Sequence, residues 1–325
     1  MGESNSMISL FTAAILILLA MLTSCVPKTP LTVEEFSITT SPGWQRHPSI
    51  SGTFVVWQDQ LKSLIRGYDL DSKAEFTVDS SLGVKKDPVI SGKFIVWADN
   101  RNGNWDIYGY NLETKEEFPI CVNPAEQRSP AIDGSIVVWV DERNDNPDVY
   151  AYNLKTKSEF PICTDPSDQV MPAISQNIIV WADNRNGNWD VYGYNLSTKE
   201  EFAIAHSAAA EYSPSISNST IVWADQRNDN PDIYGYDLEI GAEFPICTEP
   251  EAQLSPAVDE NIVVWRDHRH GNWDIYGYDL ALKTEFPICT DFAEQWSPSV
   301  SGNTVVWMDK RNGNWDIYGA KLLYR

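Results

Sequence analysis

Apolar and polar residues alternate with a period of two over short stretches of this chain. Ile262–Trp265 and Trp273–Tyr278 are rich in β-branched and aromatic residues, and turn-forming residues separate them. This alternation predicts β-strands rather than helices. Between the two runs lies Arg269–Asn272, whose counterparts elsewhere contain Asn-Gly or Asp-Asn. Asn and Gly accept positive φ angles at low cost, so this segment is predicted to be a hairpin turn.

The strand pattern belongs to a unit of about 42 residues that occurs seven times. Each copy carries a tryptophan after a run of β-branched residues: Trp57, Trp97, Trp139, Trp181, Trp223, Trp265 and Trp307. In the copy at Gln253–Thr290, two further strands are predicted, at Pro256–Val258 and at Glu285–Thr290, and the proline inside the latter is typical of an edge strand. Four antiparallel strands per repeat predict an all-β, seven-bladed β-propeller.

Side-chain size and the two chain ends order the strands within the ring. The strand with Pro-Ala-Val carries Ser, Ala or Val at the position of Ala257, which suits a crowded innermost strand. The seventh copy stops at Arg325 without an outer strand, whereas Val33–Thr40 matches that strand and has no blade of its own. We therefore expect residues 33–325 to form one propeller whose last blade is closed by the N-terminal strand.

The residues before the repeats predict export. Ile8–Leu22 is an apolar run followed by Thr-Ser-Cys. Residues 1–25 resemble a lipoprotein signal peptide with a lipobox, in which Cys25 would be lipidated, and an uncleaved membrane anchor or simple secretion are the alternatives. Residues 26–32 would be a tether. Each alternative predicts an extracytoplasmic location, either membrane-anchored at the cell surface or in the periplasm, or secreted.

The net charge argues against one class of binding partner, and the cysteine positions argue against disulfides. The net charge of −22 argues against binding to nucleic acid. Four cysteines occupy the same outer-strand position in different blades, where their separation should exceed the ~7 Å limit for a disulfide: Cys121, Cys163, Cys247 and Cys289. We expect free, buried thiols, a monomer and no cofactor.

The repeat resembles the TolB-like (WD40-like) propeller repeat. The resemblance rests on the Trp-Asp-Ile-Tyr-Gly-Tyr-Asn-Leu run at 105–112 and the Ser-Pro-Ala-Ile-Asp-Gly run at 129–134, and it extends over 33–325. The namesake of that family is a periplasmic propeller that binds partner proteins, including a lipoprotein. The resemblance therefore implies an interaction scaffold outside the cytoplasm. This chain differs in lacking an N-terminal α/β domain and in having one more blade.

An Asp-Arg-Asp pattern recurs in the hairpins of six blades, as at Asp183, Arg185 and Asp190. Calcium loops need oxygen ligands at alternate positions, but here an arginine occupies the third position. We interpret the pattern as an arginine that bridges two carboxylates within each blade, and we expect no metal site.

Two sets of residues are candidate binding sites. Stacking on sugars is the hypothesis for four tryptophans that follow the hairpin turn, unless each merely covers its own hairpin: Trp105, Trp189, Trp273 and Trp315. Seven residues that vary between blades precede each inner strand and should line the mouth of a central channel: Arg46, Lys86, Arg128, Val170, Tyr212, Leu254 and Trp296. This mouth ring is cationic in blades 1–3 and apolar or aromatic in blades 4–7, which suits an amphipathic anionic segment or ligand, although loop drift explains it equally well.

Residues for catalysis do not form one recognisable set. The histidines His47, His206, His268 and His270 fall in three different blades, and no Ser/His/Asp set is present. An active site requires a single asymmetric constellation. We therefore predict a non-catalytic scaffold that binds a protein partner in the envelope or at the cell surface, and not an enzyme. The alternative is a carbohydrate-binding or carbohydrate-active surface propeller.

Overall fold

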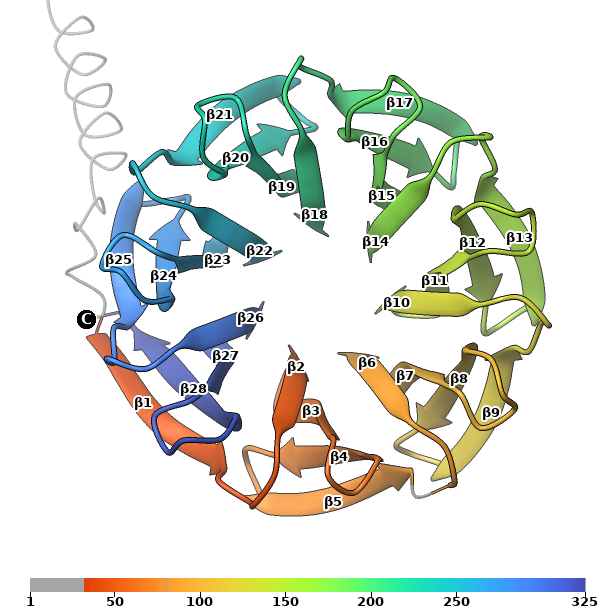
Figure 1. Cartoon of the computed structure of the whole chain (residues 1–325), viewed down its shortest axis with the longest axis horizontal. Coiled ribbons are helices and arrows are strands. Elements are labelled where there is room, and N and C mark those ends of the chain that lie inside the picture. The colour runs from red at the N-terminus through yellow and green to blue at the C-terminus, as the bar shows by residue number, and fades with distance from the viewer. Residues whose placement is uncertain (1–31, 80, 325) are drawn as a thin grey trace, which may run out of the picture.

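The computed structural model describes residues 32–79 and 81–324, and its strands form seven four-stranded antiparallel sheets. Figure 1 shows these sheets as blades around a central axis, with β2, β6, β10, β14, β18, β22 and β26 innermost. The predicted all-β, seven-bladed β-propeller is confirmed. No helix occurs among the described residues, so none there could cross a membrane. The predicted export segment, Cys25 and nearly all of the predicted tether lie outside the described residues.

From the axis outward, the blades consist of the following strands. Blade 1 contains β2 (Gln45–Ser51), β3 (Phe54–Asp59), β4 (Leu64–Asp69) and β5 (Ala74–Asp79); blade 2 contains β6 (Lys85–Ser91), β7 (Phe94–Asp99), β8 (Asp106–Asn111) and β9 (Glu116–Cys121); blade 3 contains β10 (Gln127–Asp133), β11 (Ile136–Asp141), β12 (Asp148–Asn153) and β13 (Ser158–Cys163); blade 4 contains β14 (Gln169–Ser175), β15 (Ile178–Asp183), β16 (Asp190–Asn195) and β17 (Glu200–Ala205).

The last three blades continue this order. Blade 5 contains β18 (Glu211–Ser217), β19 (Thr220–Asp225), β20 (Asp232–Asp237) and β21 (Ala242–Cys247); blade 6 contains β22 (Gln253–Asp259), β23 (Ile262–Asp267), β24 (Asp274–Asp279) and β25 (Thr284–Cys289); blade 7 contains β26 (Gln295–Ser301), β27 (Thr304–Asp309), β28 (Asp316–Leu323) and β1 (Thr32–Thr39).

The N-terminal strand closes the ring, as the sequence predicts. Strand β1 begins at Thr32, one residue before the predicted start, and pairs antiparallel with β28, with Thr32 opposite Leu323. Arg311, in the hairpin of blade 7, donates to Glu35 of β1 at 3.0 Å. The last blade is therefore completed by the other end of the chain and has four strands like the other six.

The apolar core is divided among the interfaces between neighbouring blades. Trp181 of blade 4 is fully buried against Val138, Val149 and Ile162 of blade 3. The other repeat tryptophans are also fully buried. Each aromatic of this size buries roughly 150–250 Å², so the seven contacts hold the blades together without one central core. Each indole N–H is satisfied, as Trp181 shows by donating to Asp183 at 2.8 Å.

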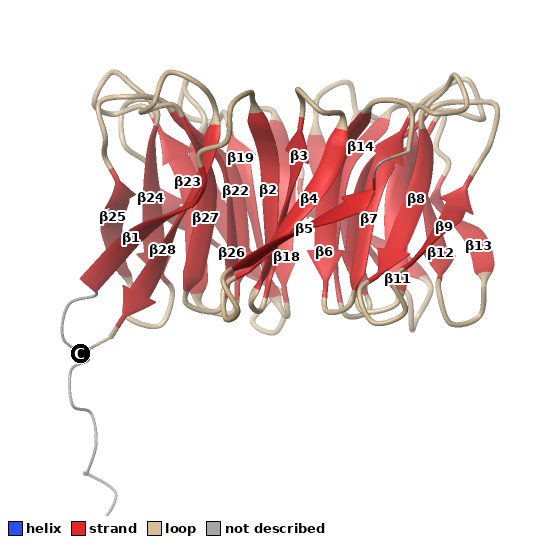
Figure 2. Cartoon of the chain, turned by 90° about the horizontal axis from the view of Figure 1, so that it is seen from below, coloured by secondary structure: helices blue, strands red, loops and turns tan. Residues whose placement is uncertain are grey.

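The ring has two faces with different loops, seen edge-on in Figure 2. Because Gln45 pairs with Asp59, the start of each inner strand lies on the same face as the turn between the second and third strands. We call this the hairpin face. Thr32, the first described residue, lies on the opposite face, since β1 crosses the thickness of the ring before β2 begins. The loop before β2 and the hairpin turns therefore lie on the far side of the ring from Thr32.

The four described cysteines are buried and free, which confirms the prediction. Burial raises the pKa of Cys163 to about 12, and it raises the pKa of the other three thiols in the same direction. These thiols are therefore protonated and poorly nucleophilic near neutral pH.

Candidate binding site on the hairpin face

The hairpin turns are held by arginine, in a way that corrects one detail of the sequence interpretation. The guanidinium of Arg185 donates to both oxygens of Asp183, at 2.9 and 2.6 Å, and also pairs with Glu201 of the outer strand. It lies 4.2 Å from the centre of the Tyr192 ring. The second carboxylate is therefore Glu201 and not Asp190, because strand pairing brings the outer strand beside the turn.

Asp190 has a different role, which is to hold the asparagines of the turn. Asn186 and Asn188 donate to its two oxygens at 2.7 and 3.0 Å. Asn188 also donates to the carbonyls of Ser207 and Ala209, in the loop that enters the next blade. Burial raises the pKa of the equivalent Asp106 and Asp148, because water is excluded around these carboxyls. These groups are occupied in supporting the fold.

Each residue of the mouth ring is the second residue of an inner strand and is followed by a β-bulge. In blade 1, Arg46 pairs with Gln58, but the register shifts before Ser49, and His47 adopts a φ of 50°. A bulge bends a strand and re-aims the neighbouring side chain. Six of the seven mouth-ring residues are half-buried, and Trp296 is exposed.

The structure brings the two predicted sets of residues together on the hairpin face. Lys86 of the mouth ring places its Nζ 4.0 Å from the centre of the Trp105 indole. Trp296 of the mouth ring lies against Trp315, with 5.5 Å between ring centroids. Trp315 is only 8% exposed, since it packs between blades 7 and 1, so it has little surface left for a sugar. The two sets therefore meet in blades 2 and 7.

Arg266, which the sequence analysis did not single out, joins this surface. It belongs to β23, and its guanidinium carbon lies 4.6 Å from the centre of Trp273 and 4.7 Å from that of Trp296. Trp273 comes from blade 6 and Trp296 from blade 7. They meet because the Trp273 carbonyl accepts a hydrogen bond from Gln295, the residue before Trp296. The guanidinium is thus held between two indoles, a favourable cation–π arrangement.

The charge of Arg266 is not neutralised by a contacting carboxylate. Among the described residues it has no ion pair or hydrogen bond, and its Nε is buried without an acceptor. Burial lowers the pKa of Arg266, which Tyr212 and Glu294 partly oppose, yet an arginine remains charged at neutral pH. Arg46 is similar, since it stacks on Trp44 at 4.6 Å and its Nε also lacks an acceptor.

The distribution of unpaired charge differs from the predicted one. Arg128 in blade 3 is neutralised by Glu142 at 2.6 Å, so the cationic half of the mouth ring does not extend to blade 3. Arg266 adds a cation in blade 6, where the mouth ring itself has Leu254. We call the resulting surface the cation–indole arc, and it runs through blades 6, 7, 1 and 2: Arg266, Trp273, Trp296, Trp315, Trp44, Arg46, Lys86 and Trp105.

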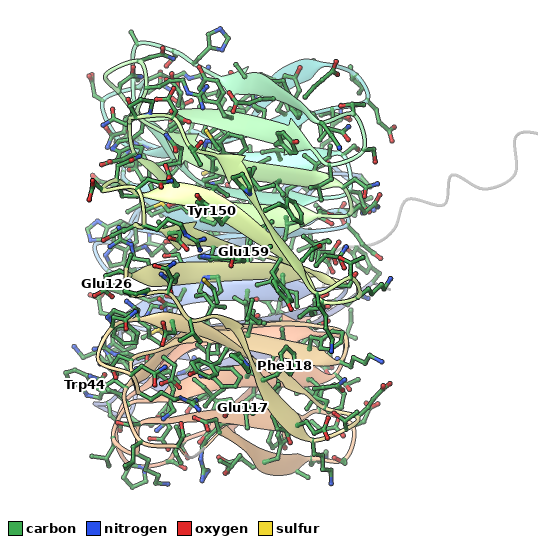
Figure 3. All side chains as sticks on the ribbon, turned by 90° about the vertical axis from the view of Figure 1, so that its right-hand side faces the viewer. Trp44, Glu117, Phe118, Glu126, Tyr150 and Glu159 are labelled. Atoms are coloured by element: carbon green, nitrogen blue, oxygen red, sulfur yellow. The ribbon has the colours of Figure 1, made fainter. Side chains whose placement is uncertain are left out.

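A pocket opens beside the arc in blade 1. The hairpin of this blade is shorter than the others, and the pocket of about 360 Å³ is lined by Gly43, Trp44, Gln60 and Leu61. Trp44 is 48% exposed and Leu61 is 67% exposed. Figure 3 shows Trp44 at the same edge of the ring as Glu126, from the loop that enters blade 3. The arc therefore offers exposed apolar surface as well as charge.

A larger groove, of about 550 Å³, lies on the opposite face between blades 5 and 6. Asp237 in its lining already accepts hydrogen bonds from Glu239 and Ile240 in its own turn. The groove is lined by turn residues of two blades and has no stacked cation. We place the candidate site at the arc for that reason.

The fold comparisons find enzymes and a TolB protein. Oligogalacturonate lyase from Vibrio parahaemolyticus superposes with a TM-score of 0.67 at 12% identity, over 90% of this chain and 96% of that chain. A putative TolB from Agrobacterium tumefaciens gives 0.51 at 14% identity, over 90% and 98%. The TolB-like fold is confirmed. Acylaminoacyl peptidase from Pyrococcus horikoshii gives 0.62 at 12%, over 86% of this chain and 52% of that chain. No family model and no curated protein matches the sequence.

These neighbours correct two predictions about function. Oligogalacturonate lyase and the acylaminoacyl peptidases are enzymes, so the prediction of a non-catalytic protein-binding scaffold, and of a chain that is not an enzyme, is wrong as it was drawn. The neighbours favour the alternative, a carbohydrate-binding or carbohydrate-active propeller. At such low identity they show the fold alone, so the function has to be argued from the residues of this chain.

One neighbouring oligogalacturonate lyase structure contains manganese. Among the described residues of this chain, no group of three or more His, Cys, Asp or Glu side chains is arranged to hold a metal ion. His268 packs on Trp273 of the arc with 4.9 Å between ring centroids. The residues present thus do not fit a manganese site, and no step is derived through a metal.

Proposed function

We propose that this chain is a carbohydrate-binding or carbohydrate-active propeller that takes saccharides on its hairpin face, at the cation–indole arc. We also propose that it works outside the cytoplasm, on the strength of the apolar N-terminal run and the cysteine that follows it. The observation that carries the saccharide proposal is the set of accessible indoles on one face, above all Trp296, Trp44 and the half-buried Trp273 and Trp105.

The arrangement suits sugars for a physical reason. A pyranose ring has a face of C–H groups that packs against an indole, while its hydroxyls need hydrogen-bond partners at the edge. Here the edges of the indoles lie beside polar groups, such as Glu294, which accepts from the Trp296 indole N–H at 3.1 Å. Several indoles along a curved arc can contact successive sugar residues of one oligosaccharide.

A matched pair of variants tests the proposal. Blades 3 and 5 carry Pro147 and Pro231 where blades 2, 4, 6 and 7 have tryptophan, so proline is compatible with this position. Trp273→Pro removes an indole of the arc, whereas Trp189→Pro makes the same change in blade 4, outside it. Both should leave the unfolding temperature within a few degrees of the original. Stacking on one aromatic is worth about 1 kcal/mol, so Trp273→Pro should weaken glycan binding about fivefold.

The measurement is binding of the ring, residues 26–325, to a panel of neutral and acidic oligosaccharides, followed by calorimetry on the best one. The same mixtures are analysed for shortened or unsaturated products, which would make the propeller carbohydrate-active. Equal binding by the two proline variants would remove the arc as the site. Absence of binding and of cleavage across the whole panel would refute the carbohydrate function.

A further inference from the structure

We propose that Arg266 selects acidic saccharides, by pairing with the carboxylate of a uronic acid residue whose neighbouring rings stack on the arc. This inference rests on the proposed function and names the class of sugar. Arg266 stands out within the repeat. The six equivalent positions are small, apolar or neutral: Gln58, Ala98, Val140, Ala182, Ala224 and Met308.

Most other arginines in the propeller are paired with carboxylates. Each hairpin arginine contacts at least two carboxylates, as Arg269 does with Asp267 at 2.6 Å and Glu285 at 2.6 Å in the same blade as Arg266. Arg128 is paired with Glu142. Among the described arginines, only Arg266 and Arg46 have no carboxylate partner, and both stack on indoles of the arc. In a chain with a net charge of −22, two unpaired guanidiniums on one surface call for an external anion.

The geometry leaves the guanidinium ready to bind. The guanidinium carbon of Arg266 lies 4.6 Å from the centre of the Trp273 ring and 4.7 Å from that of the Trp296 ring, and these contacts use none of its N–H groups as hydrogen-bond donors. Those N–H groups match a carboxylate, which accepts two parallel hydrogen bonds from one guanidinium. The terminal nitrogens of Arg266 are neither buried nor hydrogen-bonded among the described residues, so they can reach a ligand.

The indoles and cations of the arc suit a polymer that presents both ring faces and carboxylates. Trp296 and Trp273 lie directly beside Arg266, and Lys86 and Arg46 provide further positive charge at the other end of the arc. A polyuronate presents one carboxylate on each sugar, together with ring faces that stack. A neutral saccharide of the same shape would use the indoles alone.

The experiment compares a short oligogalacturonate with its methyl ester, which has the same sugar rings without the charge. The full ring is compared with Arg266→Met, which introduces the residue found at the equivalent position of blade 7. Arg128→Met, which removes a mouth-ring arginine that already has a partner, is the control. Losing a charge-assisted pair should weaken oligogalacturonate binding by roughly tenfold to a hundredfold, while binding of the ester and the unfolding temperature stay unchanged.

The outcomes separate this inference from the proposed function. Equal weakening of acid and ester binding by Arg266→Met would make Arg266 a packing residue and overturn the inference. Binding of the ester or of neutral glycans in preference to the acid would also overturn it, yet would leave the carbohydrate function standing. Absence of binding to every saccharide would overturn both. An equal loss in Arg128→Met would show a general charge effect and not selection by Arg266.

Discussion

Glu211 should make the stability of this propeller fall as the pH rises towards neutrality. It is the first residue of β18 and fully buried, at a position where five blades have glutamine and blade 2 has Lys85. One carboxylate oxygen accepts from the Ser207 backbone N–H at 3.1 Å and from the Ser207 hydroxyl. The other oxygen is buried without a partner among the described residues. Burial raises the pKa of Glu211 from 4.5 to about 7, and the charges of Asp225 and Asp190 add to the shift.

The sign and size follow from proton linkage. Between these two pKa values the folded chain holds a proton on Glu211 that the unfolded chain has lost. The contribution of this proton to the free energy of unfolding is therefore fully present below about pH 4.5 and is lost as the pH rises through about 7. One pKa unit corresponds to about 1.4 kcal/mol, so the loss amounts to roughly 3 kcal/mol. Glu211→Gln keeps the shape of the protonated side chain and removes the titration.

Urea unfolding at several pH values from 4 to 8 tests this. Glu211→Gln should match the original chain at the acid end and exceed its free energy of unfolding by up to roughly 3 kcal/mol at pH 8. Gln169→Glu places a carboxyl at the same position of blade 4 and should create a similar dependence. A difference between Glu211→Gln and the original chain that is the same at pH 5 and pH 8 would refute the assigned pKa.

Three further predictions concern the blade framework. Trp181→Phe should lower the free energy of unfolding by about 1–3 kcal/mol, since it leaves the buried Asp183 without its indole donor; chemical denaturation measures this, and a change below about 0.5 kcal/mol would contradict it. The thiol of Cys163 should react with a soluble disulfide reagent only after unfolding, because its pKa is about 12. Fast labelling of Cys163 in the folded chain would contradict this expectation. Cys163→Ala should lower the free energy of unfolding by less than about 1.5 kcal/mol, since Ala205 fills the same position in blade 4.

The fold was predictable because every blade repeats the same constraints. Seven copies of one strand pattern determine the strand order, and the strand left over at Val33–Thr40 has one place where it can pair. The arginine clamp was predictable only in part. The sequence places Asp190 next to Arg185, but the partner is Glu201, which strand pairing brings close from the outer strand.

The candidate site depends on contacts within and between blades that a repeat pattern does not display. The charge of Arg128 is cancelled by Glu142, which follows β11 in the same blade, because β10 pairs with β11. Trp315 is buried by residues of blade 1. Arg266 could have been identified from the sequence, because it is the one charged residue at its repeat position. The prediction of a protein scaffold rested on the absence of a recognisable set of catalytic residues in the sequence. Residues from several blades can form a site without being close together in the sequence, so this absence was weak evidence.

Ring closure has a consequence for the order in which the molecule is completed. Every blade except the last forms from one continuous stretch of chain, whereas β1 can pair only after β28 has been made. Until then β1 remains an unpaired strand, at risk of pairing with other chains. The cation–indole arc crosses this seam, with Trp296 and Trp315 in blade 7 and Trp44 and Arg46 in blade 1. A saccharide that contacts both sides would bind only the closed ring, and by mass action it would hold the two ends of the chain together.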